Sequence, residues 1–175
     1  MDVESPAPSG GFAEVDAFRG FMSFYFTGVS VVCAIDAGGR PHGLTCNSLS
    51  SVTISPPTLQ IGLNLRSGTL AAVRERGSFG VNLLHERAEQ AARLFASAEP
   101  GRFERTPWRS STHLGVPWLV DDAFAMAECR VARIVTIGDH AVVFGHVTHV
   151  ECGPGAPLLY GRRAFTRLLG QEART

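Results

Sequence analysis

The 175-residue chain contains no lysine, and all sixteen of its basic residues are arginine. The absence of lysine excludes a Schiff-base mechanism on a lysine side chain and excludes a phosphate-binding P-loop, which requires one. No GxGxxG segment follows an expected strand, so the dinucleotide fingerprint of Rossmann folds is also missing. Any nucleotide that binds to this protein must therefore be bound by a motif other than a P-loop or a Rossmann fingerprint.

Metal and redox motifs are missing as well. The chain has four widely separated cysteines and no CxxC pair, which predicts reduced thiols and a cytoplasmic protein. His146 and His149 have the spacing of an HxxH metal pair, but side chains three residues apart on a strand point to opposite faces. We therefore expect no metal site. The cysteines are Cys33, Cys46, Cys129 and Cys152.

Charge of one sign and long apolar runs are also lacking. Sixteen acidic residues balance the arginines, so nothing indicates binding to nucleic acid. No run is long enough to cross a membrane, and residues 1–12 lack the basic start of a signal peptide, which predicts a disordered tail. Hydrophobic residues make up 45% and charged residues 18%, a proportion that favours an oligomer burying apolar surface between subunits.

What the chain has is a series of short apolar segments separated by turn residues. Turns such as Gly138-Asp139-His140 join neighbouring strands directly, and strands do not alternate with helices. The pattern predicts one mainly β domain over residues 13–175, an antiparallel barrel with a few inserted helices. The expected strands are Val29–Ile35, one from about Pro41, Thr58–Asn64, Ser78–Leu84, Phe124–Ile137 and Ala141–Glu151, and the expected helices are Asp16–Phe24, 67–76 and His85–Ala96.

The segment from Gly43 to Pro57 is the most unusual one. It leads from an apolar strand into a block of small hydroxyl and amide residues and ends at a double proline. Buried hydroxyl and amide groups need hydrogen-bond partners, so an ordinary core strand does not collect them. Together with exposed backbone N–H groups they suit a polar planar ligand or a phosphate. A polar turn between two strands is the alternative.

Two further segments are candidates for ligand binding. Arg66–Thr69 precedes an expected helix, whose N-terminus favours an anion, but Ser67 alone also makes a plain N-cap. His140 lies at a hairpin tip, facing solvent or a cleft, where most histidines have no role. A serine hydrolase is not indicated because there is no GxSxG, and nothing marks Cys46 as an activated nucleophile.

Four segments occur in the order typical of one family: Tyr25–Val29, Gly43–Pro57, Phe79–Leu84 and the Gly138-Asp139-His140 turn. Over roughly residues 15 to 168 the chain resembles the short-chain flavin reductases that serve two-component flavin-dependent monooxygenases. The resemblance implies an FMN-binding split barrel and a homodimer. It also implies reduction of free FAD or FMN by NADH, with NADPH possible, and release of the reduced flavin to a separate monooxygenase. A split-barrel oxygenase that retains its flavin and a non-catalytic flavin-binding module are the alternatives.

The resemblance also implies a set of site residues. His140 is expected near the nicotinamide as the catalytic residue. The family often has proline at the position of Phe26, and this departure leaves the geometry of the entry to the strand open. It often has lysine near the position of Arg66, and this departure leaves the preference between FAD and FMN open. The expected flavin-binding residues are Thr27, Gly28 and Val29 beside the ring, Thr45, Cys46, Asn47 and Ser48 around the isoalloxazine, Ser50, Ser51 and Val52 along the ribityl chain or ring edge, Ser67 and Thr69 near the phosphate, and Asn82.

Overall fold

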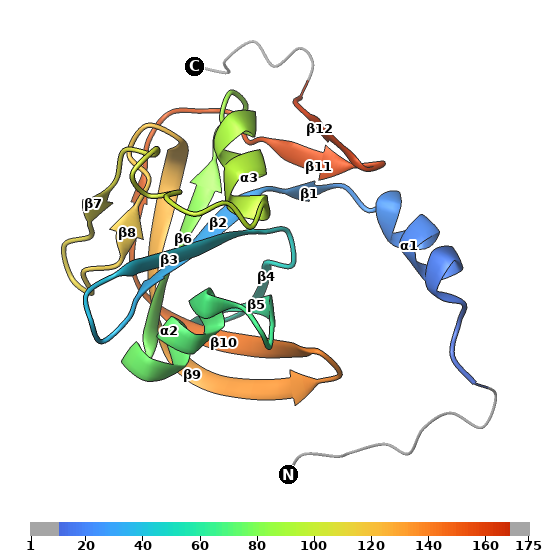
Figure 1. Ribbon diagram of the computed structural model, residues 1–175, viewed down its shortest axis with the longest axis horizontal. Coiled ribbons are helices and arrows are strands. Elements are labelled where there is room, and N and C mark those ends of the chain that lie inside the picture. Colours follow the sequence, from blue (N-terminus) through green and yellow to red (C-terminus); the bar gives the residue numbers. More distant parts are fainter. Residues whose placement is uncertain (1–10, 169–175) are drawn as a thin grey trace.

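The computed structural model describes residues 11–168. Strands dominate this part of the chain, and most of them are antiparallel neighbours (Figure 1). The predicted tail, residues 1–12, lies outside the described residues except for Gly11 and Phe12. The helices are α1 (Val15–Ser23), α2 (Gly68–Arg76) and α3 (Glu89–Ala96). The strands are β1 (Thr27–Gly28), β2 (Ser30–Ile35), β3 (Pro41–Cys46), β4 (Ser50–Ile54), β5 (Pro57–Asn64), β6 (Ser78–Leu84), β7 (Arg109–Ser110), β8 (Pro117–Trp118), β9 (Ala123–Ile137), β10 (His140–Cys152), β11 (Leu159–Gly161) and β12 (Ala164–Thr166).

Seven strands form the main antiparallel sheet in the order β3-β2-β6-β9-β10-β5-β4. The longest pair, β9 and β10, is joined at Gly138, whose φ of 58° suits glycine in a tight turn. Two small sheets flank the main one, β1-β11-β12 and β7-β8. The mainly β, antiparallel prediction with a few helices is therefore confirmed.

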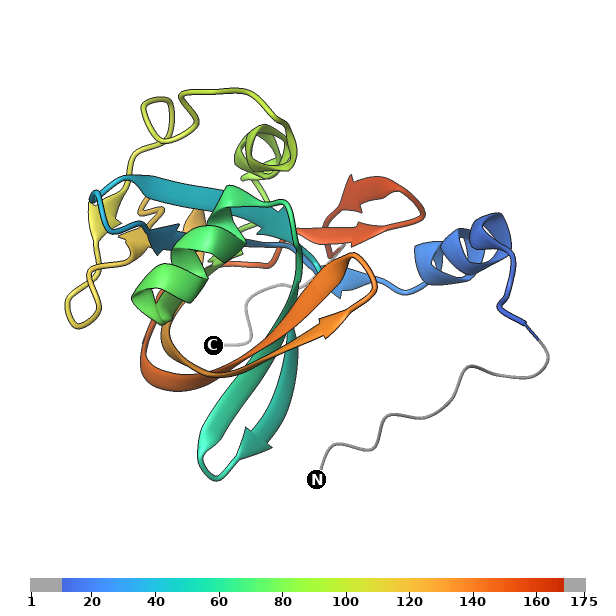
Figure 2. The same cartoon turned by 60° about the horizontal axis from the view of Figure 1, so that its bottom comes forward.

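The two ends of the main sheet meet at Ser48, just beyond β3. Its Oγ accepts a hydrogen bond from the backbone N–H of Gly62 in β5 (2.9 Å) and donates one to the carbonyl of the same residue (3.1 Å). β3 is one edge of the sheet, and β5 is next to the other edge, so the sheet curls strongly. Figure 2 shows α2 lying across this curled sheet.

Apolar residues pack in two clusters separated by the sheet. One cluster contains Leu70 and Val73 of α2 with Ile61 and Leu63 of β5, and the other contains Phe95 of α3. α2 begins at its N-cap Ser67, whose Oγ accepts from the N–H of Leu70 (3.1 Å), and it ends at Gly77 with φ 64°. Both boundaries agree with the sequence expectation.

The third helix begins later than the sequence predicts. The expected helix spans His85–Ala96, but α3 starts at Glu89. The backbone N–H of His85 donates to Asp122, and that of Glu86 donates to Ala156. These tertiary hydrogen bonds hold residues 85–88 in a bridge and turn instead of a first helical turn.

One carboxylate is completely buried in the sheet. Glu128 of β9 is 0% exposed, and its Oε1 accepts hydrogen bonds from the backbone N–H groups of His113 and Leu114, each at 3.2 Å. The Nδ1 of His113 lies 3.2 Å from the other carboxylate oxygen, Oε2. Glu128 thus fixes the loop between β7 and β8 against the sheet.

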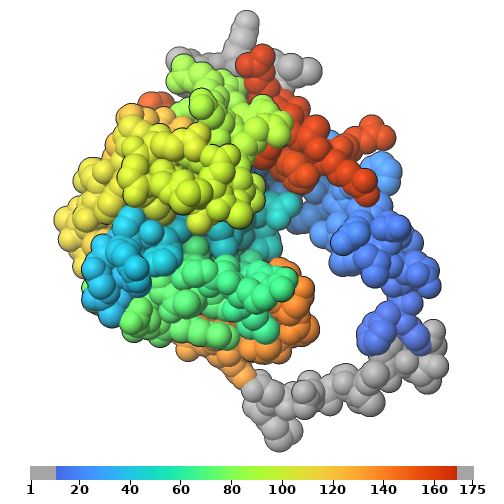
Figure 3. All heavy atoms as spheres, viewed as in Figure 1, coloured from blue at the N-terminus to red at the C-terminus, as the bar shows by residue number. Residues whose placement is uncertain are grey.

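Helix α1 projects away from the sheet and has no buried residue. Figure 3 shows open space between this helix and the β9–β10 hairpin. The C-terminal end of α1 is attached to the turn between β11 and β12. The N–H of Arg162 donates to the carbonyl of Ser23, and the Arg162 guanidinium lies 5.4 Å from the Phe24 ring centre. No helix within residues 11–168 has the length and apolar character needed to cross a membrane.

Candidate functional site

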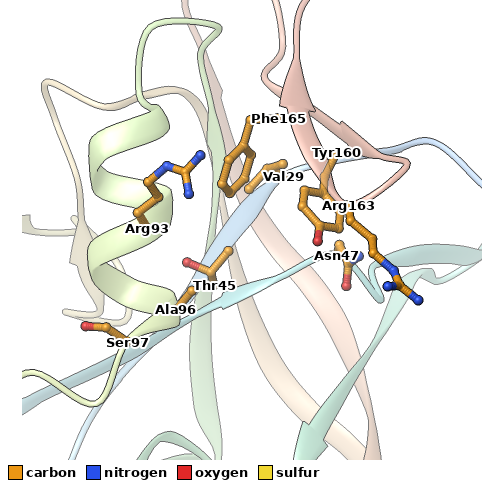
Figure 4. Close-up of a pocket in the computed structure, with 9 residues that line it drawn as sticks. All are labelled: Val29, Thr45, Asn47, Arg93, Ala96, Ser97, Tyr160, Arg163 and Phe165. Carbon is orange, nitrogen blue, oxygen red and sulfur yellow. The ribbon is translucent and has the colours of Figure 1, made fainter. Parts of the chain in front are cut away.

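A cavity of about 460 Å³ opens between β3, α3 and the small sheet that contains β11 and β12 (Figure 4). Its volume is in the range of pockets that bind small molecules or part of a dinucleotide. Polar, cationic and aromatic side chains from segments far apart in the sequence line it. The lining residues are Val29, Thr45, Asn47, Arg93, Ala96, Ser97, Tyr160, Arg163 and Phe165.

Three of the predicted flavin-binding residues line this cavity: Val29, Thr45 and Asn47. Val29 is almost fully buried, and the Oγ1 of Thr45 donates to the carbonyl of Ala92 in α3 at 2.6 Å. Thr45 therefore fixes α3 to β3 at the cavity floor. Asn47 is exposed, and its side chain has no hydrogen-bond partner within residues 11–168, so its amide is available to a ligand.

The other polar and aromatic residues that line the cavity were not predicted as site residues from the sequence. Arg93 comes from α3, whereas Tyr160, Arg163 and Phe165 come from the β11–β12 hairpin. The rings of Tyr160 and Phe165 pack edge to face with centres 5.2 Å apart, and the Arg93 guanidinium lies 5.0 Å from the Phe165 ring centre. The one available signal was the pair of adjacent arginines between two aromatic positions, residues 160 and 165.

A second group of predicted residues lies around the tip of the β9–β10 hairpin. His140 is exposed, and its Nδ1 is 2.7 Å from the Oδ1 of Asp139. This hydrogen bond lowers the pKa of Asp139. The carbonyl of Asp139 accepts from the N–H of Leu65, so the tip is held beside Arg66 and Ser67 at the start of α2. The structure therefore brings His140 and Ser67 into one neighbourhood.

The predicted residues of β4 lie on the exposed edge of the main sheet. Ser50, Ser51 and Val52 are all exposed, and β4 pairs with β5 on one side only. Gly28 is also exposed, on β1, where it pairs with Leu159. The neighbouring Thr27 has a buried Oγ1 without a hydrogen-bond partner in the described part of the chain.

Two further predicted residues, Cys46 and Thr69, are buried. Cys46 is 4% exposed, and burial raises the pKa of its thiol, while its Sγ lies 3.2 Å from the Oγ of Ser48. Thr69 is 3% exposed inside α2. For these positions only the backbone, or a neighbouring side chain, can meet a ligand at the surface.

Asn82, also predicted to bind flavin, has a buried side chain that is hydrogen-bonded within the protein. Asn82 is 0% exposed, and its Oδ1 accepts from the N–H of Leu119 at 2.9 Å. Its Nδ2 donates to the carbonyls of Val31 (3.3 Å) and Pro117 (3.1 Å). Because both ends of the amide are used inside the protein, Asn82 ties β2 and β6 to the segment around β8.

The site offers binding groups for a planar, anionic nucleotide. The cavity supplies aromatic walls, one free amide and arginine, and the hairpin group supplies a histidine next to a helix N-terminus. The free amide of Asn47 fits a ligand with hydrogen-bonding ring edges. Among residues 11–168, no three His, Cys, Asp or Glu side chains are grouped so as to hold a metal ion.

Comparison with known proteins agrees with this chemistry. The chain is 48% identical over 165 residues to a flavin reductase (NADPH) of Lentzea aerocolonigenes, covering 94% of this chain and 96% of the relative. The solved structure of nitrilotriacetate monooxygenase component B from Mycobacterium thermoresistibile is 31% identical, with a TM-score of 0.84 and coverage of 91% and 89%. An NADH:FAD oxidoreductase of Streptomyces globisporus, solved with NAD and FAD fragments, is 28% identical, with a TM-score of 0.83 and coverage of 89% and 93%.

The family match extends over most of the chain. Residues 22–169 match the family described as the flavin reductase like domain. This range includes β1 to β12 and every residue of the cavity and of the hairpin group. The chain therefore belongs to the flavin reductase like domain family.

Proposed function

We infer that the protein is an NAD(P)H:flavin oxidoreductase that reduces free FAD or FMN and supplies the reduced flavin to a separate monooxygenase. The observation that carries this inference is the 48% identity to a flavin reductase (NADPH) along nearly the whole of both chains. The solved relative that is a monooxygenase component supports the supply role. Residues 13–175 form the reductase domain in this proposal.

The proposed hydride transfer does not require an acidic or basic side chain of the protein to react. When bound, the flavin accepts a hydride from the nicotinamide, so both reacting centres belong to the cofactors. Asn47 and the backbone N–H groups between Thr45 and Ser48 orient the isoalloxazine and stabilise its charge. Ser67 and the N-terminus of α2 hold its phosphate, and the exposed β4 residues follow its ribityl chain.

The curled sheet is the split barrel of this family in our proposal. The hydrogen bonds of Ser48 to Gly62 support it, because they join the two ends of the main sheet. Asn47 and Ser48 are consecutive, so the same junction presents the amide to the cavity. A barrel closed in this way fixes the position of the ring-binding residues.

His140 orients the nicotinamide, and its replacement tests this role. We expect His140→Ala to lower kcat/KM for the nicotinamide cofactor by about 5- to 150-fold, the effect of one lost hydrogen bond of about 1–3 kcal/mol. Flavin affinity should change little. Steady-state rates measured against both substrates separate these two effects.

Asp139→Asn is the matched control for the His140 variant, since it leaves the imidazole in place and removes only the charge beside it. A smaller loss is expected in this variant. Normal nicotinamide kinetics in His140→Ala would remove His140 from the site.

The exposed apolar face of α1 supports a homodimer. Phe18 and Phe21 of the helix are 58% and 72% exposed, and Tyr25, just beyond its C-terminal end, is 66% exposed. Monomers rarely expose a contiguous apolar patch of this kind. Because the chain has no other described segment that covers this face, a second copy is its occupant in our proposal. The four free cysteines support a cytoplasmic location.

Replacing Phe21 with serine should weaken the dimer. The change removes a large apolar side chain from the exposed face of α1 and leaves the sheet untouched. Sedimentation velocity across a concentration series should show a higher dimer dissociation constant than for the parent protein. Arg19→Ala, on the same helix, is the control and should leave the dimer intact; a parent protein that sediments as a monomer would contradict the dimer.

One experiment tests the activity itself. The protein is mixed in air with FAD or FMN and with NADH or NADPH, and nicotinamide absorbance is followed. Catalytic loss of absorbance that depends on added flavin is the expected result. A protein that stays yellow through dialysis and does not consume nicotinamide would instead be a flavin-retaining enzyme or a binding module. Tight retention of reduced flavin in stopped-flow traces would contradict the supply role.

A further inference from the structure

The turn between β11 and β12 consists of two arginines in an unusual backbone conformation. Arg162 has φ 51° and Arg163 has φ 62°, a left-handed region that favours glycine or asparagine over other residues. The two arginines are the central residues of a two-residue hairpin turn between Gly161 and Ala164, which requires positive φ at both positions. The two arginines have different environments, and this difference identifies which of them serves a ligand.

Arg162 has a structural role. Its backbone N–H donates to Ser23, and its guanidinium lies over the ring of Phe24, so it attaches α1 to the hairpin. Arg163 does not take part in this contact. Its side chain lines the cavity and lies near Asn47 (Figure 4).

The positive charge of Arg163 is not neutralised within the cavity. Among residues 11–168 no carboxylate forms an ion pair with Arg163, and none lines the cavity. The other cavity arginine, Arg93, is neutralised by Glu89, whose Oε1 lies 2.6 Å from Nη2 and 2.8 Å from Nε. The lining of the cavity therefore carries one unpaired positive charge, that of Arg163, together with the free amide of Asn47 and the ring of Tyr160.

We propose that this cavity is a phosphate subsite and that Arg163 binds a phosphate group of one of the two nucleotides. The guanidinium presents several N–H donors in a planar fork that matches phosphate oxygens, and the aromatic wall beside it suits the attached ring. This subsite lies apart from the start of α2, where the flavin phosphate is placed in the proposed function. The inference rests on that proposed function, because it takes the ligands to be flavin and nicotinamide nucleotides.

Calorimetric titration of Arg163→Gln with riboflavin, FMN, FAD, NADH and NADPH tests the subsite. We expect about a tenfold loss of affinity for the ligand whose phosphate is bound, with a smaller loss at high salt. A loss for FAD but not FMN assigns the second phosphate of FAD, and a loss for both but not riboflavin moves the shared flavin phosphate from the start of α2 to this cavity. A loss for NADPH but not NADH assigns the 2′-phosphate. A salt-sensitive loss for NADH and NADPH alike assigns their pyrophosphate.

Two matched variants complete the test. Arg162→Gln removes an arginine from the same turn, at the same kind of φ, but outside the cavity, and keeps the backbone N–H that attaches α1, so nucleotide affinity should stay unchanged. Arg163→Lys keeps the charge and should restore part of the affinity. Unchanged affinity of Arg163→Gln for all five ligands, or an equal loss for riboflavin and its phosphates, would overturn the proposal. The titrations measure binding without turnover. A parent protein without activity would therefore refute the proposed activity, while its nucleotide affinities would still test the phosphate subsite.

Discussion

Replacing Asn82 with alanine is expected to lower the free energy of unfolding by about 3 kcal/mol. The change leaves the N–H of Leu119 without its acceptor and the carbonyl of Pro117 without a donor, and each lost partner in a buried setting costs about 1–3 kcal/mol. Urea unfolding followed by fluorescence measures the effect. The folded fraction of the variant should bind FAD as tightly as the parent, because the Asn82 side chain is 0% exposed.

Asn64→Ala is the matched control for this prediction. Asn64 also uses its Oδ1 to accept a backbone N–H, that of Arg66, but at an exposed site where water replaces the lost acceptor. Its expected cost is below about 1 kcal/mol. If Asn82→Ala were as stable as the parent and bound flavin more weakly, the structural role of Asn82 would be contradicted and its predicted role in flavin binding would be supported.

Replacing Glu128 is expected to have the second large effect. Glu128→Ala leaves two backbone N–H groups, those of His113 and Leu114, without their acceptor and opens a cavity in the sheet. We expect a loss of about 2–4 kcal/mol at pH 7, with the loop between β7 and β8 becoming sensitive to proteolysis. Urea unfolding measures the loss of stability, and limited digestion with thermolysin, which cleaves before apolar residues such as Leu114 and Val116, measures the exposure of the loop.

The charge of Glu128 should appear as a pH dependence. Burial acts to raise the pKa of Glu128, but hydrogen bonds from Ser111 and from the N–H groups of Leu114 and His113 outweigh it, so the pKa is lowered. A carboxyl whose pKa is lower in the folded state stabilises that state above its unfolded pKa of about 4.3, and this stabilisation is lost as the pH falls toward the folded pKa.

Glu128→Gln keeps an acceptor oxygen and removes the charge, so it isolates this pH dependence. The stability difference between the parent and Glu128→Gln should be largest near neutral pH and should shrink below about pH 4. Unfolding curves at several pH values give the difference directly. A difference that stays constant from pH 7 to pH 3 would show that the carboxylate charge contributes nothing.

The strands, the hairpins and the hairpin-tip histidine were predictable because local patterns encode them. Apolar residues mark β2, β5 and β6, and Gly138-Asp139 marks the turn before His140. The boundaries of α2 were also predictable, since Ser67 and Gly77 act through their own helix.

What sequence reasoning missed depends on contacts between distant segments. Arg93 and Arg163 reach one cavity from positions seventy residues apart, and no local pattern reports this. The motif around Asn82 does not reveal that its amide faces β8 instead of a ligand. The start of α3 likewise depends on hydrogen bonds of His85 and Glu86 to distant carbonyls.

The attachment of α1 at the β11–β12 turn has a consequence for how assembly and ligand affinity influence each other. Arg162 holds the helix and the next residue, Arg163, faces the cavity, so a single peptide bond links the two contacts. Whatever packs on the helix therefore also restrains the backbone of the turn that carries Arg163. Subunit association and nucleotide affinity should accordingly be thermodynamically coupled, each strengthening the other by the same factor.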